Sequence, residues 1–130
     1  MHDVIMLDTL MTDHVIANRG MLVDIKPSVM FLVIMTNVGN LIVNQQGTMA
    51  GAGHVWYNSN AISNILSQAR LVEVYRIMMD TSPENTITVH APFREARFNE
   101  GNGLYQCSMD QWVPATCGTR WQSWCLMHKM

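Results

Sequence analysis

The first 107 positions alternate short apolar segments with turn-forming residues, and this pattern limits the possible folds more than any other feature of the sequence. The longest uninterrupted apolar run, VMFLVIM at 29–35, has seven residues. Strands in globular proteins have about this length, whereas a membrane-spanning helix needs roughly 18 apolar residues or more. The sequence therefore predicts a β-rich domain that does not interact with a membrane.

Two β-hairpins can be placed along the chain. The segment 29–36 is rich in β-branched and aromatic residues, which is typical of a strand buried on both faces, and the turn signal VGN at 38–40 leads into a partner strand at 40–46. A second pair, 75–80 and 85–91, flanks the turn-forming sequence TSPE. In this second pair Ile87 and Val89 alternate with polar residues, which predicts a strand with one solvated face.

One segment, SQARLVEV at 67–74, departs from β alternation. Ser67 is a suitable N-cap, so we predict one short helix there. Six or more short strands with a single helix in about 105 residues favour an all-β fold, and we expect a small closed β-barrel because closure removes exposed strand edges.

The composition changes once, near residue 107. The 130 residues suffice for one domain with a real core, and we place that domain at residues 4–107. Residues 108–130 hold three of the four tryptophans and show neither strand nor helix periodicity. This tail is either a linker towards a further domain or a terminus translated in the wrong frame.

Charge and ligand-forming residues exclude several classes of function. The net charge of −2 offers no basic surface for nucleic acid. The five histidines are scattered, and the three cysteines match no zinc or redox spacing, so we expect free thiols, no metal and no cofactor. The N-terminus lacks a basic-then-apolar signal sequence, so an intracellular protein is expected.

Several motifs, taken in order, resemble the protease segment of copia-type retrotransposon polyproteins. They are LDTLMTDHV at 7–15, GAGHVWYNSNAISNILSQARL at 51–71, YRIMMD at 75–80, ITVH at 87–90 and NGLYQC at 102–107. The amino-acid sequence of the second motif is most similar to that of copia-like elements of algae and other protists. Each motif is weak alone, but their order and spacing together are specific. The resemblance covers roughly residues 4–107 and implies a retropepsin-like acid-protease barrel in a cytoplasmic protein or a virus-like particle.

The resemblance also implies roles for individual residues. Asp8 matches the catalytic aspartate, and Thr9 matches the Ser/Thr that supports the active-site loop. Thr12 and His14 match the Thr and His that follow in the family. The family's active site needs two chains, because two carboxylates a few ångströms apart share one proton, so that one activates a water while the other donates to the scissile carbonyl. The implied assembly is a homodimer that acts on a polyprotein peptide.

Leu10 departs from the family, which has Gly after Asp-Thr. The glycine lets a backbone N–H approach the carboxylates without a Cβ in the way, so Leu10 is expected to weaken activity and, if its φ is positive, to add about 1–3 kcal/mol of strain. From residue chemistry alone, Asp8 can equally be a strand-end residue that makes a side-chain-to-backbone turn.

Three further residues need interpretation. His14 follows Asp13, but neighbours on a strand face opposite ways, so a solvated His14 is expected rather than an acid–base pair. The stretch GTMAGAGH at 47–54 lacks the Lys-Ser/Thr of a phosphate loop, and Gly51 and Gly53 are candidates for a β-turn or a flap over substrate.

Two functions of different classes remain open. The first is an aspartic endopeptidase that cuts its own polyprotein and binds substrate as an added strand. The second is a catalytically inactive barrel module that has a structural or interaction role, or is a decaying remnant. Leu10 favours the second, and Asp8 with Thr9 favours the first.

Overall fold

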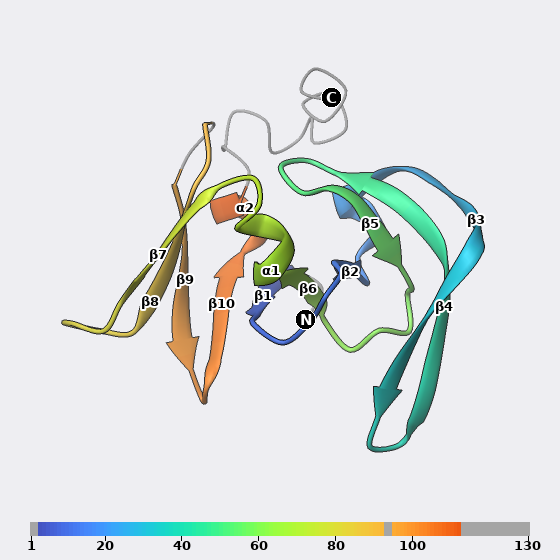
Figure 1. Ribbon diagram of the computed structural model, residues 1–130, viewed down its shortest axis with the longest axis horizontal. Helices are drawn as coiled ribbons and strands as arrows, with labels where there is room; N and C mark the ends of the chain where they lie inside the picture. Colours follow the sequence, from blue (N-terminus) through green and yellow to red (C-terminus); the bar gives the residue numbers. More distant parts are fainter. Residues whose placement is uncertain (1–2, 93–94, 113–130) are drawn as a thin grey trace.

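The computed structural model describes residues 3–92 and 95–112, which form one sheet of ten strands and three short helical segments (Figure 1). The all-β prediction is confirmed. The elements in chain order are β1 (Val4–Asp8), β2 (Val15–Ile16), the 3-10 helix η1 (Arg19–Met21), β3 (Leu22–Thr36), β4 (Gly39–Met49), β5 (Gly53–Tyr57), β6 (Asn64–Ser67), α1 (Gln68–Leu71), β7 (Arg76–Asp80), β8 (Thr86–His90), β9 (Glu95–Gly101), β10 (Leu104–Ser108) and α2 (Met109–Trp112).

The strands follow the order β3-β4-β5-β2-β6-β1-β10-β9-β8-β7. This order has two ends, β3 and β7, so backbone pairing among the described residues leaves the sheet open. The expected closure into a barrel is therefore not confirmed. In Figure 1 the two hairpins β3–β4 and β7–β8 lie on opposite sides of a centre formed by β1, β6 and β2.

The centre of the sheet has a crossed connection. Strand β6 is parallel to β1 and antiparallel to β2, so it lies between two strands that are neighbours in the sequence. The chain therefore leaves β1, passes the end of β6 through residues 9–14, and returns as β2 on the other side. In the β1–β6 register Asp8 is opposite Ser67, so the connection begins beside the start of α1.

The hydrophobic core includes residues of these central strands and of the strands on both sides of them. Ile5 and Leu7 point inward from β1, as the alternation of the strand requires, and the core also includes residues from β5, β6, β8 and β9. Its fully or nearly fully buried apolar residues include Ile16, Met21, Leu22, Met49, Val55, Leu66, Leu71, Ile87, Val89 and Phe98. Burial of Ile87 and Val89 confirms the predicted solvated-face alternation of that strand.

The described fold continues past residue 107. In α2, Trp112 is fully buried, its indole N–H donates to the Ala50 carbonyl at 2.7 Å, and its ring meets Phe98 edge-on at 6.3 Å between centroids. Residues 113–130 of the predicted tail, including Cys117 and Cys125, lie outside the described residues. Cys107 is buried and is not part of a disulfide, as predicted for it.

Both predicted hairpins are present, as β3–β4 and β7–β8. The prediction that residues 29–36 are buried on both faces is wrong. Their exposed members include Val29, Met30, Phe31, Val33 and Met35. The reason is position: β3 is an end strand, and β4 pairs with β5 only from Gln45 onward, so the outer part of the hairpin has no neighbouring strand.

The predicted helix is present but short. It spans Gln68–Leu71, and Ser67 caps it as predicted, with its Oγ accepting from the Arg70 N–H at 3.2 Å. Within the described part of 4–107, α1 is the single α-helix, as predicted; the 3-10 helix η1 was not predicted, and α2 follows this range. None of the helices in the described ranges is long and apolar enough to cross a membrane.

Candidate active site

Asp8 is the last residue of β1, and its half-buried carboxylate lies where the chain turns into the 9–14 loop. Its Oδ1 accepts a hydrogen bond from the Leu10 N–H at 2.7 Å. A carboxylate that accepts from the backbone two residues on forms an Asx turn. Within the described chain no other hydrogen bond of Asp8 is found, so Oδ2 is available to a ligand or a second copy.

Leu10 does not create the expected backbone strain. The non-glycine residues with positive φ in the described ranges are Asp24 and Asn102, so Leu10 occupies an ordinary region of backbone conformation. Its N–H donates to the Asp8 carboxylate despite the Cβ, and its side chain is 89% exposed. Any effect of Leu10 on chemistry must therefore come from that exposed side chain beside Asp8.

Ser67 fastens the 9–14 loop to the junction of β6 and α1. Its Oγ donates to the Met11 carbonyl at 2.7 Å, and its backbone N–H donates to Nδ1 of His14 at 2.9 Å. Arg70, one turn further along α1, forms an ion pair with Asp13 at 2.8 Å. We call Ser67 and Arg70 together the loop anchor.

The prediction of a solvated His14 is wrong, because the residue is only 4% exposed. The residues that follow it, Val15–Ile16 of β2, are also buried, so both faces of the chain are covered here and the side that His14 faces is interior. Acceptance of the Ser67 N–H at Nδ1 places the proton of the neutral ring on Nε2. Burial, reinforced by the Arg70 guanidinium and opposed by Asp13, lowers the pKa of His14 to about 4.

The remaining loop residues have smaller roles. Thr9 and Thr12 are exposed, and the Thr12 hydroxyl donates to Asp13 Oδ2 at 3.4 Å. The structure therefore gathers Asp8, Leu10 and His14 into one loop and leaves the Thr9 side chain on its surface.

Asn64, the first residue of β6, is a fully buried polar residue that sequence reasoning missed. Its Oδ1 accepts from the N–H groups of Ala17 and Asn18 at 2.9 and 2.8 Å, and its Nδ2 donates to the Val4 carbonyl at 3.0 Å. It thus connects β1 to the residues that follow β2. The available signal was its place in NILS, the motif that leads into the helix.

Gly51 and Gly53 lie in the tight turn between β4 and β5, where both have positive φ. This is the turn position predicted for them. The Gly51 carbonyl accepts from the Tyr75 hydroxyl at 2.8 Å, which fixes the turn to the segment after α1. The outer part of the β3–β4 hairpin, by contrast, extends away from the centre of the fold (Figure 1).

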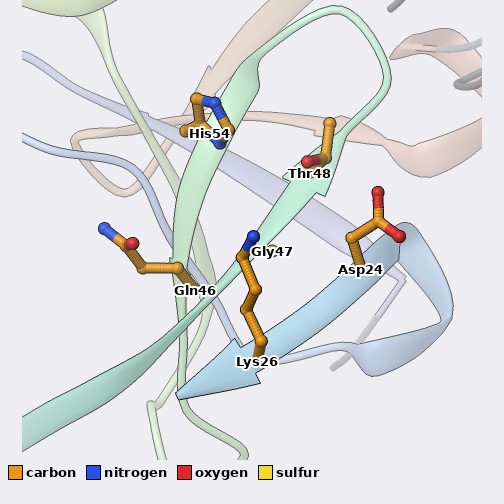
Figure 2. A pocket seen from close by; sticks show the side chains of 6 residues that line it. All are labelled: Asp24, Lys26, Gln46, Gly47, Thr48 and His54. Carbon is orange, nitrogen blue, oxygen red and sulfur yellow. The ribbon is translucent and has the colours of Figure 1, made fainter. Parts of the chain in front are cut away.

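A shallow pocket of about 350 Å³ lies on the β3–β4–β5 surface and is separate from the Asp8 loop. Figure 2 shows the side chains that line it, namely Asp24, Lys26, Gln46, Thr48 and His54, around Gly47. Asp24 has φ 57° at a register shift between β3 and β4. The pocket offers charges of both signs, but Asp8 and His14 do not line it.

In the described ranges, no group of three or more His, Cys, Asp or Glu side chains is close enough to hold a metal ion. No protein-family model matches the sequence, and no curated protein sequence matches it significantly. The resemblance to copia-type proteases therefore rests on the sequence motifs alone.

Proposed function

We propose that this chain is the aspartic endopeptidase-like domain of a copia-type retrotransposon polyprotein, with Asp8 as its catalytic residue. The observation that carries the proposal is the placement of Asp8. It ends a central strand, it accepts from the N–H of the residue after Asp-Thr, and its loop is fastened to the β6–α1 junction. The motifs LDTLMTDHV at 7–15 and NILSQARL at 64–71 are distant in the sequence but in direct contact, since Ser67 and His14 are 53 positions apart.

One copy of the chain holds one such carboxylate, and the reaction needs two. Two copies related by a two-fold axis would bring the Asp8 carboxylates together and let them share a proton. The ionised member takes a proton from water as the water attacks the peptide carbonyl carbon, and the protonated member donates to the carbonyl oxygen. Asp8 Oδ2 supplies the acceptor for this proton exchange.

The substrate would bind as an extended strand beneath a cover. We assign the cover to the outer β3–β4 hairpin, whose exposed apolar side chains include Phe31, Met35 and Ile42. The Gly51–Gly53 turn suits this role less well, because Tyr75 fixes it. An extended peptide adds to such an edge through backbone hydrogen bonds and places alternate side chains in pockets.

A specific observation favours an alternative function. The hydrogen bond of Asp8 Oδ1 is that of an ordinary Asx turn, and the neighbouring Leu10 is 89% exposed. A catalytically inactive module that binds other chains through its apolar hairpin would have the same features.

Cleavage of a broad peptide library separates the two functions. Peptidase activity of the full chain should fall to background in Asp8→Asn, which keeps the shape but removes the titrating group. Asp80→Asn, an exposed carboxylate at the end of β7, is the matched control and should retain activity. Equal cleavage by Asp8→Asn and wild type would remove Asp8 from the mechanism, and absence of cleavage by a folded dimer would favour the inactive module.

A further inference from the structure

His14 is a base that the proposed chemistry does not use. It is almost completely buried, although it lies in the same loop as Asp8 and separates the exposed part of that loop from β2. Its ring does not act on a substrate from this position. Its role therefore lies in the hydrogen bonds that it makes within the protein.

The His14 ring completes a set of contacts between the 9–14 loop and the loop anchor. Ser67 contributes both of its polar groups, since Oγ donates to Met11 and the backbone N–H donates to His14. Arg70 adds the ion pair to Asp13, but that pair is partly exposed and so contributes little. The bond from the Ser67 N–H to His14 joins two buried groups, so its loss leaves them without a water to replace it.

We propose that His14 is a positioning residue, which holds the Asp8-bearing loop on Ser67 only while its ring is neutral and which releases the loop when the ring is protonated. A protonated ring carries hydrogen on Nδ1 as well as on Nε2. It then presents a donor to the Ser67 N–H, so the hydrogen bond is lost and two donors face each other. The loop then keeps only the Ser67–Met11 and Arg70–Asp13 contacts with the β6–α1 junction, so it separates from that junction more often.

The surrounding charges act in opposite directions on this equilibrium. Arg70 of α1 disfavours a charge on the ring, whereas Asp13 in the loop favours it. Burial and Arg70 prevail and keep the ring neutral down to a pH of about 4. Strand β5 contacts His14 through the backbone, with the Trp56 N–H donating to the His14 carbonyl at 3.0 Å.

The chain offers a substitution that isolates the acceptor from the titration. In His14→Asn the amide oxygen can occupy the position of Nδ1 and accept from Ser67, but it cannot be protonated at moderate pH. His14→Leu removes the acceptor at every pH. His54→Asn, at an exposed histidine on β5, is the matched control for loss of an imidazole.

Amide hydrogen exchange and NMR titration of the full chain from about pH 7 to about pH 3 test the proposal. In wild type, the exchange rate of the Ser67 amide, corrected for the pH dependence of intrinsic exchange, should rise by about tenfold or more on acidification. The midpoint of this rise should coincide with that of the His14 ring titration, while the amides of β8 and β9 stay protected. His54→Asn should behave as wild type. His14→Asn should stay protected over the whole range, and His14→Leu should exchange rapidly at neutral pH.

Three results would overturn the proposal. The first is a Ser67 exchange rate that does not change as His14 titrates. The second is an acid transition that persists in His14→Asn. The third is simultaneous loss of protection in β8 and β9, which would indicate global unfolding. If the variants fail to fold, the wild-type protein still tests the proposal, because the midpoint of Ser67 amide exchange must coincide with that of the His14 ring titration.

The catalytic consequence rests on the proposed function, whereas the exchange measurement does not. If the chain cleaves peptides, the acid side of its kcat profile should lose the His14 transition in His14→Asn, with KM little changed. If no cleavage is found in any variant, the proposed function fails, and the role of His14 is then tested by amide hydrogen exchange alone.

Discussion

His14 shows how a single buried side chain can connect pH to stability. The unfolded chain binds its proton with a pKa near the ordinary 6.5, and the folded chain with a pKa of about 4. Between these values the unfolded state holds more protons, so the free energy of unfolding must decrease as the pH falls. The stabilisation that His14 provides is complete above about pH 6.5 and is lost by about pH 4, below which its effect is constant.

This difference predicts a loss of up to about 3 kcal/mol of unfolding free energy from His14 alone on acidification. Urea unfolding at about pH 7 and about pH 4.5 measures it. His14→Asn should lose about 2 kcal/mol less than wild type over this interval, because the carboxylates common to both proteins cancel in the comparison. An identical loss in the two proteins would show that His14 is not buried in its neutral form.

Among the strands, β6 has the largest influence on the site, although it has only four residues. It separates β1 from β2, begins with the buried Asn64 and ends with Ser67, so each of its ends fastens a different part of the crossed connection. Its interior residue Leu66 is fully buried. The strand therefore joins the core to the loop that carries Asp8.

Asn64→Ala should lower the free energy of unfolding by about 3 kcal/mol, because it removes three hydrogen bonds, one to the buried Ala17 N–H and two to the partly buried Asn18 N–H and Val4 carbonyl. Asn99→Ala, at an exposed asparagine of β9, should change it by less than about 0.5 kcal/mol. Thermal or urea unfolding of the two variants makes the comparison. Similar small effects would mean that Asn64 does not hold β1 to β2.

Local signals predicted local structure well. Turn residues located both hairpins, and Ser67 located the start of α1, because each of these depends on a few adjacent side chains. The exposure of 29–36 and the burial of His14 could not be predicted in this way. Both depend on which strand lies at the end of the sheet and which at its centre, and that order is set by pairings between residues distant in the sequence.

The candidate site was likewise predicted only in part from the sequence. The motif around Asp8 could be recognised from the sequence, and so could the departure at Leu10. That Leu10 has no positive φ, and that its N–H bonds to the Asp8 carboxylate, required coordinates. The role of Asn64 required them too, because its partners are 46, 47 and 60 residues away.

The proposed peptidase requires a dimer that brings two Asp8 carboxylates together, and in such a dimer the exposed Leu10 side chains would meet near the same axis. Two branched side chains at this point would occupy space next to the scissile bond or hold the aspartates apart. The backbone itself is not strained at Leu10, so the obstacle is the side chain alone. Removal of that side chain is therefore the most informative change to the whole assembly.

The decisive measurement is the rate of peptide-library cleavage by Leu10→Gly and by the double variant Asp8→Asn with Leu10→Gly, on samples shown to be folded and dimeric by sedimentation. Leu10→Gly should raise kcat/KM about tenfold or more over wild type, with an acidic optimum where the paired carboxylates hold one proton. The double variant should fall to the no-enzyme background. A folded, dimeric Leu10→Gly that cleaves no better than background would contradict the assignment of this chain as a peptidase.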